Sequence, residues 1–208
     1  QLNINFSSQS QFMFNMITMA SLYDEKNGSF LLIPHNVKGT WATTNRLYVE
    51  KGLGKSREWS LNNEILYRKY VTAVMSGQVG EGLQTSKTIR NIIDETARLV
   101  FQRKHLTLKL NAGFSYSGAK NRLTSSNYDA WDIRYGFNLT CSLPWNIKFA
   151  GDLTSLTRKG YKLEEINKTR VVSNISLYKT FLKDRITIQC KAYDIFHQLT
   201  NIDNGIFE

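Results

Sequence analysis

Residues 105–143, HLTLKLNAGFSYSGAKNRLTSSNYDAWDIRYGFNLTCSL, contain the pattern that decides the fold. From Leu106 to Tyr116, and again from Trp131 to Leu143, apolar side chains alternate with polar residues or glycine. Successive side chains of a strand point to opposite faces, so each stretch has one apolar and one polar face. Strands usually have about five or six residues, whereas these stretches approach the roughly 9–11 residues with which a tilted strand crosses a bilayer. The pattern predicts two long strands joined by a polar loop at 118–127.

The composition is compatible with a membrane-spanning β-protein. The chain has 208 residues, enough for one all-β domain or part of a larger one. Aromatic residues make up 12%, only 2 residues are proline, and no apolar run is long enough for a transmembrane helix. A mean hydropathy of −0.35 does not exclude membrane strands, because half of their side chains face a polar lumen. No secretion signal begins at Gln1, so we expect a processed chain or an internal piece of a longer one.

The net charge of +10 suggests an anionic partner such as nucleic acid, anionic lipid or an acidic ligand. The chain contains no run of five like charges and no nucleic-acid recognition motif, so nucleic acid is not expected as a partner. The two cysteines, Cys141 and Cys190, lack the spacing of a metal site. Both fall on apolar positions of their strands, and we expect small buried or lipid-facing thiols rather than a disulfide. No metal or cofactor is expected.

Alternation elsewhere predicts seven further strands. Residues 1–23 are expected to form one long strand with a bulge near Ser10 and Gln11, followed by a turn at 24–28. Residues 29–50 are expected to return as one strand that becomes regular near Asn36, after Pro34. The remaining strands are expected around 59–68, 88–101, 147–153, 171–178 and 186–193. A helix is the alternative for 88–101, and the phases of 1–23 and 88–101 are left open.

These strands predict an all-β fold, an antiparallel up-and-down meander of about nine long strands. The connections expected to be short are 51–57, 102–104, 143–146 and 181–184. The connections expected to be longer or more polar are 24–28, 74–87, 118–127 and 158–168. Short turns on one side and long loops on the other are typical of an outer-membrane barrel. Aromatic residues near the strand ends, such as Trp59, Phe101, Tyr116 and Trp131, are typical of its interfacial girdles.

The two phases of the strands give two sets of candidate residues. The lipid-facing candidates are Leu106, Leu108, Leu110, Phe114, Ile133, Tyr135, Phe137 and Leu139. The lumen-facing basic candidates are Arg68, Arg90, Arg98, Lys109, Arg134, Lys148 and Lys191. Charges this frequent on one face need water or partners. A wide lumen supplies the water, and an ordinary solvated sheet exterior is the alternative.

Two runs, from Asn174 to Phe181 and from Arg185 to Phe196, resemble the last hairpin but one of TonB-dependent outer-membrane receptors of the Bacteroidetes type. Residues 36–41 and 142–145 fit the same family. The resemblance implies a barrel of about 22 strands that holds an N-terminal plug. It also implies nutrient import driven by an energy-coupling TonB protein of the inner membrane.

The chain departs from this family pattern, because it has no plug, no segment for docking the energy-coupling protein and no aromatic closing strand. We therefore expect residues 1–208 to be one incomplete barrel segment, the C-terminal part of a receptor in the bacterial outer membrane. Its expected partners are membrane lipid and, in the full-length parent, the plug domain and TonB. Loops 74–87 and 118–127 are expected to make the outside contacts, and the substrate is left open.

An enzyme is not expected. The histidines His35, His105 and His197 share no motif with a serine or an acid, and Gly-x-Ser-x-Gly is absent. The Gly-rich stretch 76–86 matches neither a phosphate loop nor a dinucleotide fingerprint. The alternative function is a soluble antiparallel β-sheet module that binds protein or carbohydrate and buries the apolar face on itself or on a partner. An isolated fragment is expected to self-associate through this face or its open edges.

Overall fold

A computed structural model describes residues 2–54, 56, 58–121, 127–181 and 185–198. These residues form eleven strands and one short 3-10 helix, η1 (Glu164–Ile166). The strands are β1 (Leu2–Met13), β2 (Met16–Asp24), β3 (Ser29–Val37), β4 (Thr40–Leu53), β5 (Trp59–Gln78), β6 (Gly82–Arg103), β7 (Leu106–Asn121), β8 (Tyr128–Leu143), β9 (Ile147–Lys159), β10 (Thr169–Phe181) and β11 (Ile186–Ala192).

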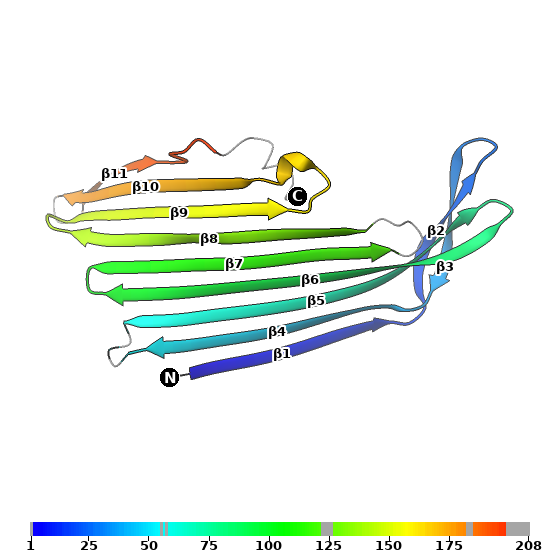
Figure 1. Cartoon of the computed structure of the whole chain (residues 1–208), viewed down its shortest axis with the longest axis horizontal. Helices are drawn as coiled ribbons and strands as arrows, with labels where there is room; N and C mark the ends of the chain where they lie inside the picture. The colour runs from blue at the N-terminus through cyan, green and yellow to red at the C-terminus, as the bar shows by residue number, and fades with distance from the viewer. Residues whose placement is uncertain (1, 55, 57, 122–126, 182–184, 199–208) are drawn as a thin grey trace.

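All the strands belong to one sheet. Its main path runs β1-β4-β5-β6-β7-β8-β9-β10-β11, and each strand on it pairs antiparallel with its neighbours (Figure 1). The predicted all-β antiparallel meander is therefore confirmed, and the main path has the nine strands expected. The other two strands, β2 and β3, form a hairpin that branches off beyond β1 and β4.

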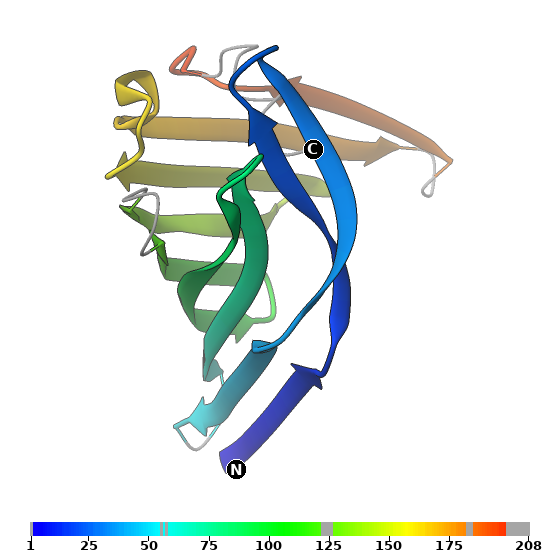
Figure 2. The ribbon, with the colours of Figure 1, turned by 90° about the vertical axis from the view of Figure 1, so that its right-hand side faces the viewer.

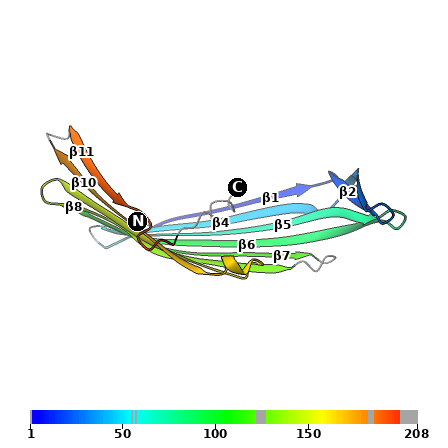
Figure 3. The same ribbon diagram turned by 90° about the horizontal axis from the view of Figure 1, so that it is seen from above.

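The sheet is a single curved layer, seen edge-on in Figure 3. Among the described residues, the buried apolar side chains are almost all small, namely Ala20, Val37, Val71, Ala73, Ala119 and Ala130. Large apolar side chains such as Phe6 (67% exposed) and Tyr135 (55% exposed) lie open. A globular domain of this length normally buries a core between two packed layers. Here backbone hydrogen bonds and same-face side-chain pairs hold the strands together, without a core between layers.

The N-terminal region differs from the prediction at two positions. The expected single strand 1–23 is wrong, because the chain breaks at Phe14 and Asn15, and Asn15 has a φ of 56°. The expected single strand 29–50 is also wrong, because it breaks at Lys38 and Gly39, where φ is 89°. A positive φ lies outside the β region, so regular strand geometry ends at these residues. The two breaks let β2 and β3 leave the main path together and cross its end (Figure 2).

The branching hairpin contains the predicted turn at 24–28, where the Gly28 N–H donates to the Asp24 carbonyl at 2.9 Å. The prediction that regular structure begins near Asn36 is wrong, because β3 starts at Ser29 and includes Pro34. Proline is tolerated because, among the described strands, β3 pairs with β2 alone and so leaves one edge open. On its other side, β2 pairs in parallel with β5, where Ser21 lies opposite Ser76.

The predicted loop 74–87 is wrong as well. It forms the tip of the β5–β6 hairpin, whose turn contains only residues 79–81. The helix alternative for 88–101 is wrong, since these residues lie within β6. Of the predicted loop 118–127, residues 118–121 belong to β7 and residues 122–126 lie outside the described part. Residues 182–184 of the expected turn 181–184 also lie outside it. The short turns expected at 102–104 and 143–146 are confirmed.

The short turns are regularly staggered. At the β4–β5 turn, the last pair of residues is Leu53 and Trp59, and Trp59 in turn lies opposite Phe101 of β6. Strand β6 continues two residues past Phe101, to Arg103, before the next turn. Leu106 lies opposite Cys141, and β8 again continues two residues further. Each pair of strands thus shifts the turn by two residues, and this end of the sheet is inclined in Figure 1. A shift of one residue per strand corresponds to about 35°, for a rise of ~3.3 Å per residue and a strand spacing of ~4.8 Å.

Candidate functional site

Strand pairing places the predicted residues on two opposite faces of the sheet. Leu108 lies opposite Leu139, and Phe114 lies opposite Ile133. Because directly paired residues share a face, all eight lipid-facing candidates lie on one face, here called the apolar face. The pairing also assigns the faces of residues 1–23 and 88–101, which the sequence left open. Phe6 of β1 lies opposite Leu47, and Leu99 of β6 lies opposite Leu110, so both strands contribute their apolar phase to this face.

The seven basic candidates lie on the other face, here called the polar face. Arg98 lies opposite Asn111, Lys109 opposite Asn138, and Arg134 opposite Gly113. The same register assigns Arg68, Arg90, Lys148 and Lys191 to the polar face. The strand alternation therefore separates the two predicted sets completely.

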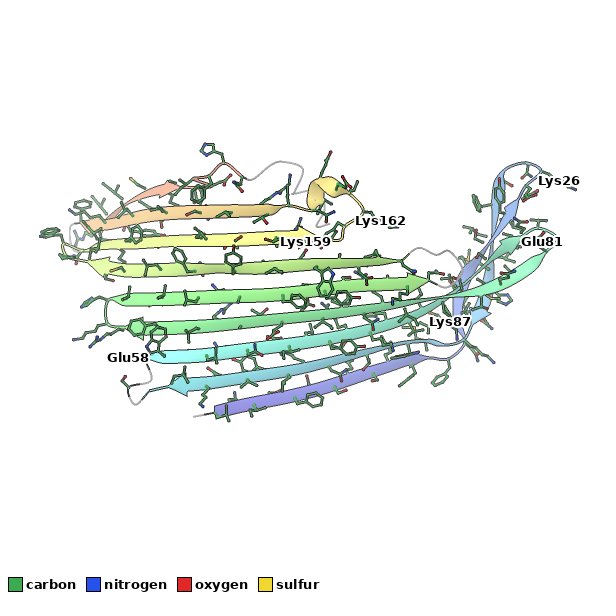
Figure 4. The ribbon with its side chains drawn as sticks, in the orientation of Figure 1. Lys26, Glu58, Glu81, Lys87, Lys159 and Lys162 are labelled. Carbon is green, nitrogen blue, oxygen red and sulfur yellow. The ribbon has the colours of Figure 1, made fainter. Side chains whose placement is uncertain are left out.

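Aromatic rings cluster near both ends of the apolar face. The rings of Trp59 and Phe101 lie 4.6 Å apart at the short-turn end, and those of Tyr116 and Trp131 lie 4.5 Å apart toward the other end. Phe101 pairs with Leu108, eight residues from Tyr116 on β7. This separation is roughly 26 Å along the strand and roughly 22 Å in height at a tilt of about 35°. Charged residues lie at both ends of the band (Figure 4): Glu58 lies beyond the short-turn end, and at the other end Lys159 pairs with Trp131 while Lys162 follows in the β9–β10 loop.

The polar face carries a network of hydrogen bonds and ion pairs between strands. Arg46 Nε lies 2.6 Å from Glu64 Oε1, joining β4 to β5. Arg98 Nε donates to Asn111 Oδ1 at 3.0 Å, joining β6 to β7. Asn111 Nδ2 in turn donates to Asn138 Oδ1 at 3.0 Å, joining β7 to β8. These contacts fix the positions of charged side chains on a surface that lacks a core behind it.

Two carboxylates, those of Asp94 and Asp132, lie on the polar face farther from the short turns than this network does. Asp94 pairs with Arg68 and accepts a hydrogen bond from the Ser115 hydroxyl at 2.6 Å. Asp132 lies 4.0 Å from Arg158 Nε and accepts a hydrogen bond from the Tyr161 hydroxyl at 2.8 Å. Each of these acids is therefore already engaged by an arginine and a hydroxyl donor of this chain.

Tyr161 anchors the β9–β10 loop to Asp132. Its backbone N–H donates to Asn167 Oδ1 at 2.9 Å, and Asn167 Nδ2 donates back to the Tyr161 carbonyl at 2.8 Å. Burial of the ring, followed by the hydrogen bond to Asp132, raises the pKa of Tyr161 to about 12. The neutral phenol is thus the form that the folded loop holds.

A hollow of about 540 Å³ lies between the hydrogen-bonded side chains of Arg98, Asn111 and Asn138 and the carboxylates of Asp94 and Asp132. Gly113 and Gly136 form its floor, and Arg98, Lys109 and Arg134 are among the side chains around it. A Cβ at Gly136 would lie 2.1 Å from the Leu153 carbonyl oxygen, so only glycine permits the close approach of β9. A Cβ at Gly113 would meet no atom closer than 3.6 Å. The hollow exists because two neighbouring strands lack side chains at adjacent positions.

The three cations around the hollow are exposed. Within the described part of the chain, Arg98, Lys109 and Arg134 form no ion pair. The hollow therefore presents uncompensated positive charge from three successive strands, β6, β7 and β8.

Comparisons with protein families, curated proteins and solved structures find no match. The geometry of the sheet and the chemistry of its faces therefore carry the functional argument. No helix in the described ranges is long and apolar enough to span a membrane. The same ranges contain no group of three or more metal-ligating side chains. Cys141 and Cys190 are free thiols on the apolar face, opposite Leu106 and Leu177 respectively.

Sequence reasoning missed two features of the faces. Glu95 lies on the apolar face between Ile93 and Ala97, and Asn63 Nδ2 donates to its Oε1 at 3.1 Å. The alternation within β6 already contained this signal, because Glu95 shares the phase of its apolar neighbours. The hollow was missed because the adjacency of Gly113 and Gly136 depends on the β7–β8 register, which the sequence alone does not specify.

Proposed function

We propose that this chain is a wall segment of an outer-membrane β-barrel that serves nutrient uptake, with its apolar face toward lipid and its polar face toward the lumen. The observation that carries the proposal is a single-layer sheet whose two faces are chemically opposite. An apolar face this large is not left open to water. A lipid bilayer covers it without a second protein layer, and closed β-barrels are one of the two architectures that span bilayers.

Three further observations support a barrel wall. The turn stagger corresponds to a strand tilt of about 35°, within the range of roughly 35–45° for membrane barrels. The aromatic clusters lie roughly 22 Å apart in height, close to the apolar band of about 25 Å that such barrels present. Among the described residues, β1 and β11 each pair on one side only, so further strands complete the wall in this proposal.

The receptor type and its partners come from sequence resemblance. The runs near residues 174–196 resemble TonB-dependent receptors, and on that basis we propose nutrient import with a plug domain and TonB as partners in the parent protein. The bacterial outer membrane is the corresponding location. The network of the polar face supports a role in lining a water-filled interior, because charged side chains require water or partners.

The test is a comparison of adjacent residues on opposite faces. In a background where Cys141 and Cys190 are replaced by alanine, single cysteines at Phe137 and Asn138 carry nitroxide spin labels in liposomes. We expect the label at 137 to be more accessible to oxygen, which partitions into lipid, and the label at 138 to be more accessible to a water-soluble nickel complex. The same comparison is repeated with labels at Leu139, on the apolar face, and at Thr140, on the polar face.

Two outcomes contradict the proposal. One is equal nickel accessibility at all four positions. The other is a chain that remains a monomer in plain buffer and does not bind detergent, which favours the soluble β-module that binds protein or carbohydrate.

A further inference from the structure

We infer that the hollow over Gly113 and Gly136 binds a small ligand through a carboxylate, sulfate or phosphate group. The inference rests on the proposed function for its setting in a lumen, and it names the substrate class that this part of the wall would take.

The first argument is the charge around the hollow. Arg98, Lys109 and Arg134 come from three neighbouring strands, so they approach the same space from different directions. Asn111 holds Arg98 Nε at 3.0 Å and thereby orients the guanidinium at the edge of the hollow. A guanidinium offers a planar fork of donors that matches carboxylate and phosphate oxygens.

The second argument is that, among the residues that the structure describes, no acid is left free to balance those cations. Asp94 and Asp132 also line the hollow, but Arg68 and Ser115 engage the first, and Arg158 and Tyr161 engage the second. Glu95 contributes to the lining, yet its side chain belongs to the apolar face and accepts from Asn63. Three positive charges therefore remain available to a ligand.

The third argument is the shape of the hollow. Its volume of about 540 Å³ lies within the range of roughly 300–1,000 Å³ that small-molecule sites occupy. Asn111 and Asn138 add amide groups next to the cations, and such groups orient a polar ligand. The glycine floor leaves space where other rows of the polar face carry side chains.

The test uses citrate, which carries several carboxylates, and isothermal titration of the whole chain in a non-ionic detergent at low salt. We expect saturable binding of citrate and no binding of its uncharged trimethyl ester. Arg98→Gln, Lys109→Gln and Arg134→Gln are each expected to weaken binding by about three- to tenfold, since each removes one charge-assisted contact. Arg90→Gln and Lys148→Gln remove the same charge from the same face outside the hollow, and they are expected to stay within about twofold.

A filling variant tests the shape separately from the charge. Gly113→Leu keeps every cation, and its Cβ meets only ordinary contacts, so it is expected to abolish citrate binding while the circular dichroism spectrum stays unchanged. If this variant fails to fold, the three charge variants still decide the matter.

Equal weakening by Arg90→Gln and by the three hollow variants would overturn the inference, because it would show general attraction to a basic chain. Non-saturable binding would overturn it as well. Site-specific citrate binding, together with spin labels that do not separate residues 137 and 138, would keep the hollow and reject the lipid-facing wall.

Discussion

At the scale of single residues, Glu95 is a carboxylate that lies among apolar side chains on the apolar face. Its neighbours along β6 are Ile93 and Ala97, and the residues opposite it are Ile65 and Phe114. A carboxylate in the lipid-facing band of a barrel is unfavourable, although less so than lysine or arginine. The hydrogen bond from Asn63 offsets part of this penalty by satisfying one oxygen.

The first prediction compares Glu95 with its neighbour Asp94. Glu95→Gln removes the charge and keeps an acceptor for Asn63, so we expect a gain of about 1 kcal/mol in the free energy of unfolding in liposomes. Asp94→Asn removes the charge from the polar face and breaks the pair with Arg68, and we expect a loss of about 1 kcal/mol. Urea titration followed by tryptophan fluorescence measures both, and the same sign for the two variants would contradict the assignment of faces.

The second prediction concerns Tyr161 and pH. The folded pKa of about 12 lies above the ordinary value of about 10. A raised pKa favours the neutral phenol in the folded state, so its stabilising effect is complete below pH ~10 and is lost as the pH rises toward 12. In tyrosinate absorbance titrations we expect the difference between the wild type and Tyr161→Phe to show one phenol titrating near pH 12. Asp132→Asn is expected to lower that pKa, and an unchanged midpoint would argue against the hydrogen bond as a cause.

At the scale of strands, Gly136 determines how closely β9 approaches β8. The Leu153 carbonyl occupies the space that a side chain at position 136 would need, whereas Gly113 on the adjacent strand has room for a methyl group. Two glycines on the same face thus have different roles. One is required by the packing of backbones, and the other only leaves space.

The third prediction uses this contrast. Gly136→Ala forces the backbone of β9 to move and is expected to lower the free energy of unfolding by about 2 kcal/mol or more. Gly113→Ala is expected to change it by no more than about 0.5 kcal/mol. The measurement is again urea unfolding in liposomes, and a similar loss in both variants would refute the close approach at Gly136.

The sequence was most informative where alternation was long and unbroken. The strands β7 and β8 and both of their faces follow from period two alone, because each covers more than ten residues. It was least informative at Asn15 and Gly39, where one residue with positive φ ends a strand. The change of phase in 1–23 predicted a bulge near Ser10 and Gln11, and this is wrong, because β1 pairs regularly there and breaks at Asn15 instead. The sequence also overestimated the loop at 74–87, because glycines at a hairpin tip look the same as glycines in a long loop. Pairing register, and with it the hollow, required the structure.

At the scale of the whole molecule, the turn stagger sets the strand direction relative to the bilayer of the proposed barrel wall. If the short turns lie at one level of a bilayer, the strands incline by about 35° from its normal. This inclination arises from pairing register alone, and it needs no knowledge of how many strands complete the wall.

The fourth prediction is this tilt. Polarised infrared spectra of the chain in oriented bilayers are expected to give a mean strand tilt of about 35° from the membrane normal. Strands lying in the membrane plane would indicate adsorption of the apolar face on the lipid surface instead of insertion. The Phe137 and Asn138 spin labels provide an independent check on the same samples.

The single-layer sheet also limits how the length of the chain can change. Inserting or deleting one residue within β7 exchanges the faces of every β7 side chain beyond that point, so leucines would move to the polar face and lysines to the apolar face. Inserting or deleting two residues keeps every side chain on its face and changes only where the strand ends. Length differences among natural variants of this protein are therefore expected in even numbers inside the strands, with odd numbers confined to bulges and to the tip between β5 and β6.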